Sequence, residues 1–94
     1  MKIVIEMEYW TSSGDVGQRR ASFGVDDLEF AIKPDLEAVR VAYQWFDHVR
    51  REYPYDIKIK SVKYNQEHDI TAGLQAVLEK EARVANEDWR APWE

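Results

Sequence analysis

The stretch PDLEAVRVAYQWFDHVRREYP, residues 34–54, decides the fold because it carries the signals of one long amphipathic helix. Pro34 suits the first helical turn, where its fixed φ fits the helix and its missing N–H is not needed. Acidic residues follow in the first turn, and Arg50 and Arg51 stand near the end, so the charges complement the helix dipole at both termini. Pro54 ends the pattern. We predict a helix from about residue 34 to residue 53.

This helix carries more apolar surface than one packed face needs. The residues that we assign to the core are Leu36, Val39, Ala42, Tyr43, Phe46, Val49 and Tyr53. Ala38, Val41 and Trp45 widen the apolar surface on one flank. At 100° per residue the whole set sweeps roughly 200°, about twice the width of one buried stripe. We therefore predict that the flank of Ala38, Val41 and Trp45 is not needed for packing against the core and stays uncovered.

Two strands precede this helix. Residues 2–10 alternate apolar and polar side chains with a period of two, and residues 18–25 do so again. The turn formers of residues 11–17 separate them, which indicates a hairpin. The expected register places Ile3 opposite Val25, Ile5 opposite Phe23, and Glu8 opposite Arg20.

Residues 26–33 fit two structures. Leu28, Phe30 and Ile32 alternate with polar or small residues, as in a strand, while the aspartate pair before them fits the start of a short helical turn. We favour a third short strand.

The second half of the chain predicts one more strand and one more helix. Residues 55–64 alternate, but the alternation changes phase, which indicates a bulge near Lys60 or Ser61 or a twisted strand exposed on both faces. Asn65 is a candidate cap for a helix from about Gln66 to Asn86 or beyond. The helix residues expected to face inward are Ile70, Leu74, Val77, Leu78, Val84 and Ala85.

These elements predict a single α+β domain over residues 1–94, with residues 88–94 as a tryptophan-rich C-terminal tail. The expected architecture is a two-layer sandwich in the order βββαβα. A mostly antiparallel sheet of three or four strands carries two helices on one face.

Composition limits the function. The net charge of −5 opposes indiscriminate binding to nucleic acid or anionic lipid. The chain has no cysteine, which removes disulfides and thiolate metal sites and fits a reducing compartment, so we expect the cytoplasm. The apolar run at the start is too short and too interrupted by charge for a signal peptide, and no stretch reaches the roughly 20 apolar residues of a membrane helix. We expect no cofactor.

Three residues are candidates for acid–base or metal chemistry. His48 and His68 each have acidic neighbours in the sequence, and Glu81 falls near the centre of the second helix's apolar stripe. A zinc site needs at least three protein ligands, and one carboxylate without a partner of opposite role is not a mechanism. We therefore expect solvated histidines, a carboxylate that reaches water, and no enzyme.

Tryptophans carry the leading hypothesis, because large exposed aromatics are enriched at protein contacts. The candidate protein-binding residues are Trp10, Ala38, Val41, Trp45, Trp89 and Trp93. We expect a small acidic protein that acts sterically on another protein or on a second copy of itself, as accessory factors, inhibitors, adaptors and phage or mobile-element proteins of this size do. The acidic residues expected to steer a basic partner are Asp26, Asp27, Glu29, Glu79, Glu87 and Asp88. In the internal alternative, the tail folds back and Trp93 packs on Trp45.

A second class remains open, a nucleic-acid-binding module on the sheet face. Its candidate residues are Arg19, Arg20, Lys58, Lys60 and Lys63, with aromatic side chains near enough to stack on bases. Glu6 and Glu8 share a face with Arg20, and neutralisation by these carboxylates opposes this hypothesis.

Overall fold

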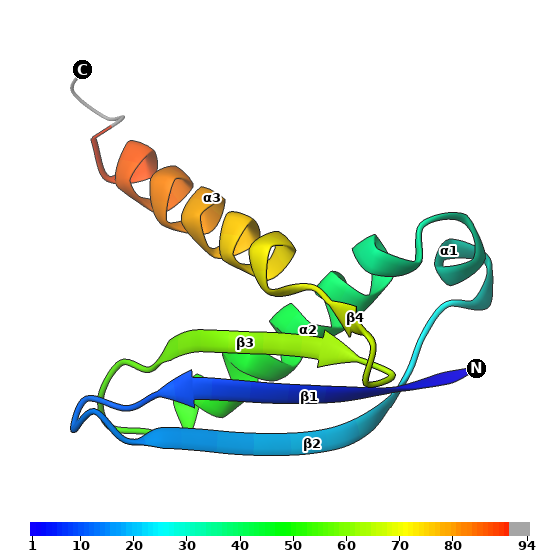
Figure 1. The fold of residues 1–94 in the computed structure, drawn as a ribbon. Helices are drawn as coiled ribbons and strands as arrows, with labels where there is room; N and C mark the ends of the chain where they lie inside the picture. The colour runs from blue at the N-terminus through cyan, green and yellow to red at the C-terminus, as the bar shows by residue number, and fades with distance from the viewer. Residues whose placement is uncertain (91–94) are drawn as a thin grey trace.

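The computed structural model describes residues 1–90 of the protein, with side chains as far as residue 81. Its elements are β1 (Lys2–Trp10), β2 (Val16–Gly24), α1 (Asp27–Ile32), α2 (Pro34–Arg51), β3 (Lys58–Tyr64), β4 (His68–Asp69) and α3 (Thr71–Arg90). The four strands form one antiparallel sheet in the order β2-β1-β3-β4 (Figure 1). The predicted α+β class is confirmed, and α2 and the first turns of α3 pack on one face of the sheet.

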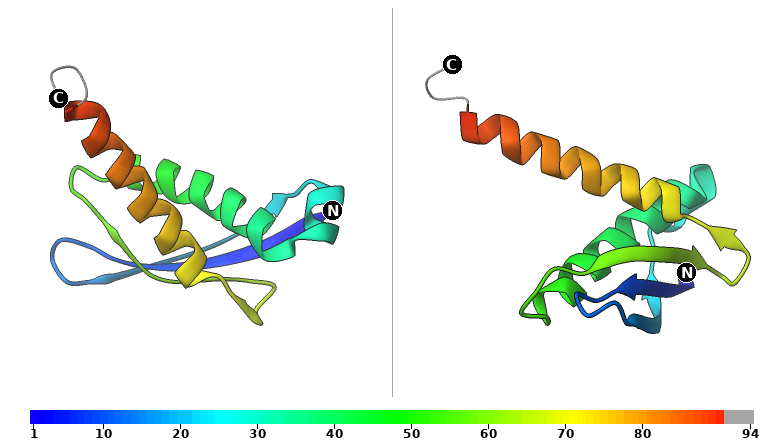
Figure 2. Two further views of the ribbon diagram at one scale, coloured as in Figure 1. Left: turned by 90° about the horizontal axis from the view of Figure 1, so that it is seen from above. Right: turned by 60° about the vertical axis from the view of Figure 1, so that its left-hand side comes forward.

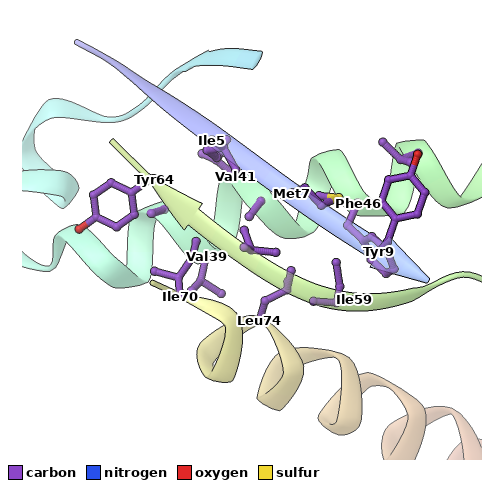
Figure 3. Close-up of a cluster of buried hydrophobic side chains, with 14 of the residues drawn as sticks. Ile5, Met7, Tyr9, Val39, Val41, Phe46, Ile59, Tyr64, Ile70 and Leu74 are labelled. Atoms are coloured by element: carbon purple, nitrogen blue, oxygen red, sulfur yellow. The ribbon is translucent and has the colours of Figure 1, made fainter. Parts of the chain in front are cut away.

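The core lies between that face and the two helices (Figure 3). β1 supplies its centre, because the alternation in its sequence buries every second side chain: Ile3, Ile5, Met7 and Tyr9. Leu74 from α3 is fully buried in the same cluster. Further along, α3 extends away from the sheet (Figure 1 and the right view of Figure 2).

The hairpin of β1 and β2 forms as predicted, but its register differs by two residues. Ile3 lies opposite Phe23, and Glu6 lies opposite Arg20. The turn is shorter than expected, since Thr11 N donates to Asp15 O at 2.9 Å and Gly14 takes a φ of 88°. A slip of two residues keeps every side chain on its predicted face, so the buried set is unaffected.

The strand that we favoured for residues 26–33 is wrong: the segment is the helix α1, the alternative of a helical turn. Asp26 caps it by accepting a hydrogen bond from Glu29 N at 3.0 Å. In the helix only Phe30 turns to the core, where its ring packs edge-on against Tyr64 at 5.9 Å between centroids. Leu28 and Ile32 lie one turn apart on the outside of α1.

The predicted bulge in β3 is confirmed. Glu8 pairs with Ser61 and Tyr9 pairs with Ile59, so Lys60 is the extra residue. The bulge lets Ile59 and Val62 share the buried face although their positions differ in parity.

The last helix begins five residues later than predicted, at Thr71 rather than about Gln66. The chain first makes the short strand β4, reached through a turn in which Asn65 and Gln66 have φ values of 49° and 68°. Asn65 does not cap a helix. Its side chain accepts a hydrogen bond from Val4 N at 3.1 Å, and its own N–H donates to Val4 O at 2.8 Å.

Replacing Asn65 with alanine should lower the free energy of unfolding by about 1–2 kcal/mol, because the Val4 N–H loses its acceptor and alanine is strained in the left-handed region. Asn65→Gly removes the same side chain without that strain and should cost less. Urea unfolding of both variants measures the difference. Equal stability of Asn65→Ala and the wild type would contradict the role given to this turn.

No helix within residues 1–90 combines the length and the apolar content that crossing a membrane requires.

Candidate functional site

Three of the most exposed apolar side chains lie on α1 and at the start of α2. Leu28 is 68% exposed, Ile32 is 63% exposed and Leu36 is 59% exposed. Full burial of a leucine or isoleucine side chain is worth about 1.5–3 kcal/mol, and at this exposure each forgoes more than half of it. Single exposed residues need no explanation, but three on neighbouring helices form a patch of the kind found at contact sites.

Next to this patch lies a depression that we call the helical groove. Its two adjoining hollows, of about 540 and 290 Å³, share Leu36, Val39 and Val77, and Tyr43 lines the larger one. Its lining residues come from α1, from the N-terminal half of α2, from the start of α3 and from the turns next to them. Charged side chains surround these apolar residues: Asp26, Glu29, Lys33, Asp35, Glu37, Arg40 and Asp69.

A buried carboxylate fixes the wall of the groove. Glu37 is only 4% exposed, and its Oε2 accepts hydrogen bonds from Asp26 N at 2.7 Å and from Arg40 Nη2 at 2.8 Å. The bond from Arg40, followed by that from the Asp26 N–H, lowers the pKa of Glu37 to about 2. Because Asp26 is the cap of α1 and Glu37 belongs to α2, this carboxylate joins two of the three helices that line the groove.

Tyr43, which lines the groove, also takes part in an interaction between α2 and α3. The Glu81 carboxylate raises the pKa of the Tyr43 hydroxyl, mainly as its hydrogen-bond partner. Arg50 Nη2 lies 3.4 Å from Glu81 Oε1, and Arg50 also pairs with Asp47 on its own helix. Glu81 is therefore a half-exposed, charge-paired residue, as expected for a carboxylate that reaches water.

The predicted spare flank of α2 is wrong for two of its three residues. Ala38 is fully buried and Val41 is 5% exposed, because the sheet covers this flank. Trp45 is half-buried, and its ring packs on Phe23 of β2 with centroids 4.9 Å apart. The apolar residue of α2 that stays exposed is Leu36, which we had assigned to the core.

The other tryptophans are divided between the sheet end and the C-terminus. Trp10 is 42% exposed at the end of β1, with Lys60 Nζ 4.9 Å from the centroid of its ring. The backbone of Trp89 belongs to α3, and its side chain lies outside the described part. Trp93 lies outside the described residues, so its packing on Trp45 stays a prediction.

The basic residues predicted for nucleic-acid binding lie among carboxylates. On the open face of the sheet, Glu6 lies between Arg20 at 3.7 Å and Lys63 at 3.9 Å, and Lys60 lies 3.7 Å from Glu8. On β2, Arg19 pairs with Glu52 at 2.8 Å and donates to the Tyr9 hydroxyl. Lys58 is exposed next to Trp10 in the ladder. This arrangement neutralises most of the positive charge that phosphate binding requires.

The two histidines lie on different elements. His48 is exposed on α2, and His68 stacks on the Tyr64 ring at 4.7 Å between centroids. Among the side chains of residues 1–81, no three of histidine, aspartate or glutamate come together in the way that holding a metal ion requires.

Sequence reasoning missed the helical groove because it treated Leu36 and Val77 as core and residues 26–33 as a strand. The available signal was the spacing of Leu28 and Ile32. If the segment is helical, these residues share a face opposite Phe30, and that face cannot reach the sheet.

Comparison of the chain with protein-family models, curated protein sequences and solved structures found no match.

Proposed function

We propose that the protein binds another protein through the helical groove and acts by occupying that protein's surface, without chemistry of its own. The observation that carries the proposal is the exposed patch of Leu28, Ile32 and Leu36 beside a hollow lined by Val39 and Val77. Burial of such a patch against a partner provides the main driving force of most protein association. This action fits an inhibitor, adaptor or other accessory factor, and the absence of cysteine fits action in the cytoplasm.

Two substitutions test the proposal without altering net charge. Leu36→Gln and Val77→Gln together remove two apolar side chains from the groove, and both positions are exposed enough to keep the fold. We expect the double variant to bind its partner at least tenfold more weakly, since central apolar anchors contribute 1–2 kcal/mol or more. The matched control is Val16→Gln, at an exposed position on β2.

The measurement compares proteins captured from the host lysate by the wild type, the double variant and the control, followed by titration of the captured protein. A protein retained by the wild type and by Val16→Gln but lost by the double variant supports the proposal. Equal retention by all three contradicts it. A second copy of the chain is the alternative partner, and light scattering of the purified protein detects a dimer directly.

A further inference from the structure

We infer that the helical groove receives a positively charged amphipathic helix of the partner protein, an inference that rests on the function proposed above. Three features of the groove lead to this occupant: the elements that form its walls, the charge around it, and the apolar side chains inside it.

The walls favour a helix over an extended segment. All but one of the residues that line the groove belong to α1, α2 or α3 or to the turns at their ends, and the exception is Asp69 of the two-residue edge strand β4. An extended peptide has backbone N–H and C=O groups to pair along its whole length, and a strand of two residues cannot pair most of them. Leaving these groups unpaired against apolar side chains is costly. A helix pairs its backbone internally and brings only side chains to the contact.

The charge around the groove selects a cationic helix. Its lining contains five carboxylates and two basic groups, and one of these, Arg40, is engaged by Glu37. Lys33 is then the basic residue of the lining left to offset the carboxylates of Asp26, Glu29, Asp35 and Asp69. The whole chain carries −5, so the field around the groove attracts positive segments and repels a second copy of this chain.

The apolar part of the groove matches one face of such a helix. Leu36, Val39 and Val77 come from two helices and line both hollows. Leu28 and Ile32 are further exposed apolar side chains on α1, the helix whose Glu29 lines the groove. A helix with apolar side chains at positions i, i+3, i+4 and i+7 presents a stripe of this kind, with lysine or arginine on its flanks to meet the carboxylates.

The test uses three designed 18-residue peptides, labelled with fluorescein and titrated with the full chain by fluorescence anisotropy. The first has leucine at helical spacing and lysine or arginine at the other positions. The second has the same composition in an order that destroys the apolar stripe. The third keeps the stripe and replaces each basic residue with glutamate. We expect the first peptide to bind at least tenfold more tightly than the other two and to gain helical circular dichroism on binding. Its affinity should fall when salt is added.

Variants of the chain locate the contact. The double variant Leu36→Gln, Val77→Gln should bind the first peptide at least tenfold more weakly than the wild type. Glu29→Lys should lower the affinity for this peptide several-fold. Asp56→Lys makes an equal change of charge in the loop after α2 and should alter the affinity less than twofold. Equal binding of the acidic or rearranged peptide, binding without gain of helix, or equal effects of the two charge variants would overturn the inference.

Failure of this inference is distinguishable from failure of the proposed function. A lysate protein that is lost by the double groove variant but binds through an acidic or extended segment overturns the cationic helix and leaves the protein-binding function standing. Equal capture by the wild type and the groove variant removes the function itself.

Discussion

Replacing Gly17 with alanine should lower the free energy of unfolding by about 2–3 kcal/mol, because the added methyl group overlaps a buried aromatic ring. Gly17 lies directly opposite Tyr9 in the hairpin. A Cβ atom there would overlap the ring carbons of Tyr9 and lie 2.8 Å from its hydroxyl oxygen. Tyr9 is 2% exposed, so its ring has no free space to move into.

The overlap reaches further because the Tyr9 hydroxyl is the centre of a small polar network. It lies 2.7 Å from the Tyr53 hydroxyl and accepts a hydrogen bond from Arg19 Nε at 3.1 Å. The bonds from Tyr9 and Arg19 lower the pKa of Tyr53, whereas burial raises that of Tyr9. Moving the ring disturbs both bonds as well as the packing.

Thermal unfolding monitored by circular dichroism measures the effect, and a loss of this size lowers Tm by roughly 10–20 °C for a domain of this length. The matched control is Gly24→Ala on the same strand, where an added Cβ meets no atom within 4 Å. That variant should stay within about 0.5 kcal/mol of the wild type. If both variants unfold at the same temperature, the contact between Gly17 and Tyr9 does not hold the hairpin.

Much of the fold could be predicted because period and parity are local properties of the sequence. The alternation of β1 identifies its buried side chains without knowledge of any partner. The phase change in residues 55–64 indicates a bulge near Lys60 or Ser61 or a twisted strand, and the structure has the bulge at Lys60. α2 begins at Pro34 as predicted and ends at Arg51, two residues before the predicted end. These features depend on geometry within one element.

The errors concern how elements meet. Residues 26–33 fit the strand period and the helix period about equally weakly. The segment is a helix because Asp26 caps it and because Phe30 then packs beside Tyr64. The side of α2 that the sheet covers likewise depends on where the strands lie. The helix pattern alone gives the width of its apolar surface and not the covered flank, and so the candidate site was placed at Ala38 and Val41 rather than at Leu36.

Replacing Glu37 with glutamine should cost about 2 kcal/mol of stability at neutral pH, since the isosteric amide loses the charge-assisted bonds to Arg40 and to Asp26 N. The loss of stability in Glu37→Gln should become smaller as the pH falls. The pKa of Glu37 is lowered from 4.5 to about 2 in the folded chain, so the folded state favours the ionised form. Its contribution is complete above pH 4.5 and disappears as the pH falls towards 2.

Urea unfolding of the wild type and Glu37→Gln between pH 7 and pH 2 isolates this carboxylate, because the other acidic groups titrate equally in both proteins. The difference in the free energy of unfolding should be constant down to about pH 5 and then narrow towards zero. A difference that stays constant down to pH 2 would contradict the lowered pKa. Because Glu37 joins the cap of α1 to α2, the variant should also loosen α1, which amide hydrogen exchange at residues 27–32 detects. The same carboxylate thus stabilises the fold and shapes the groove, so partner binding should weaken in Glu37→Gln although its apolar contact residues are unchanged.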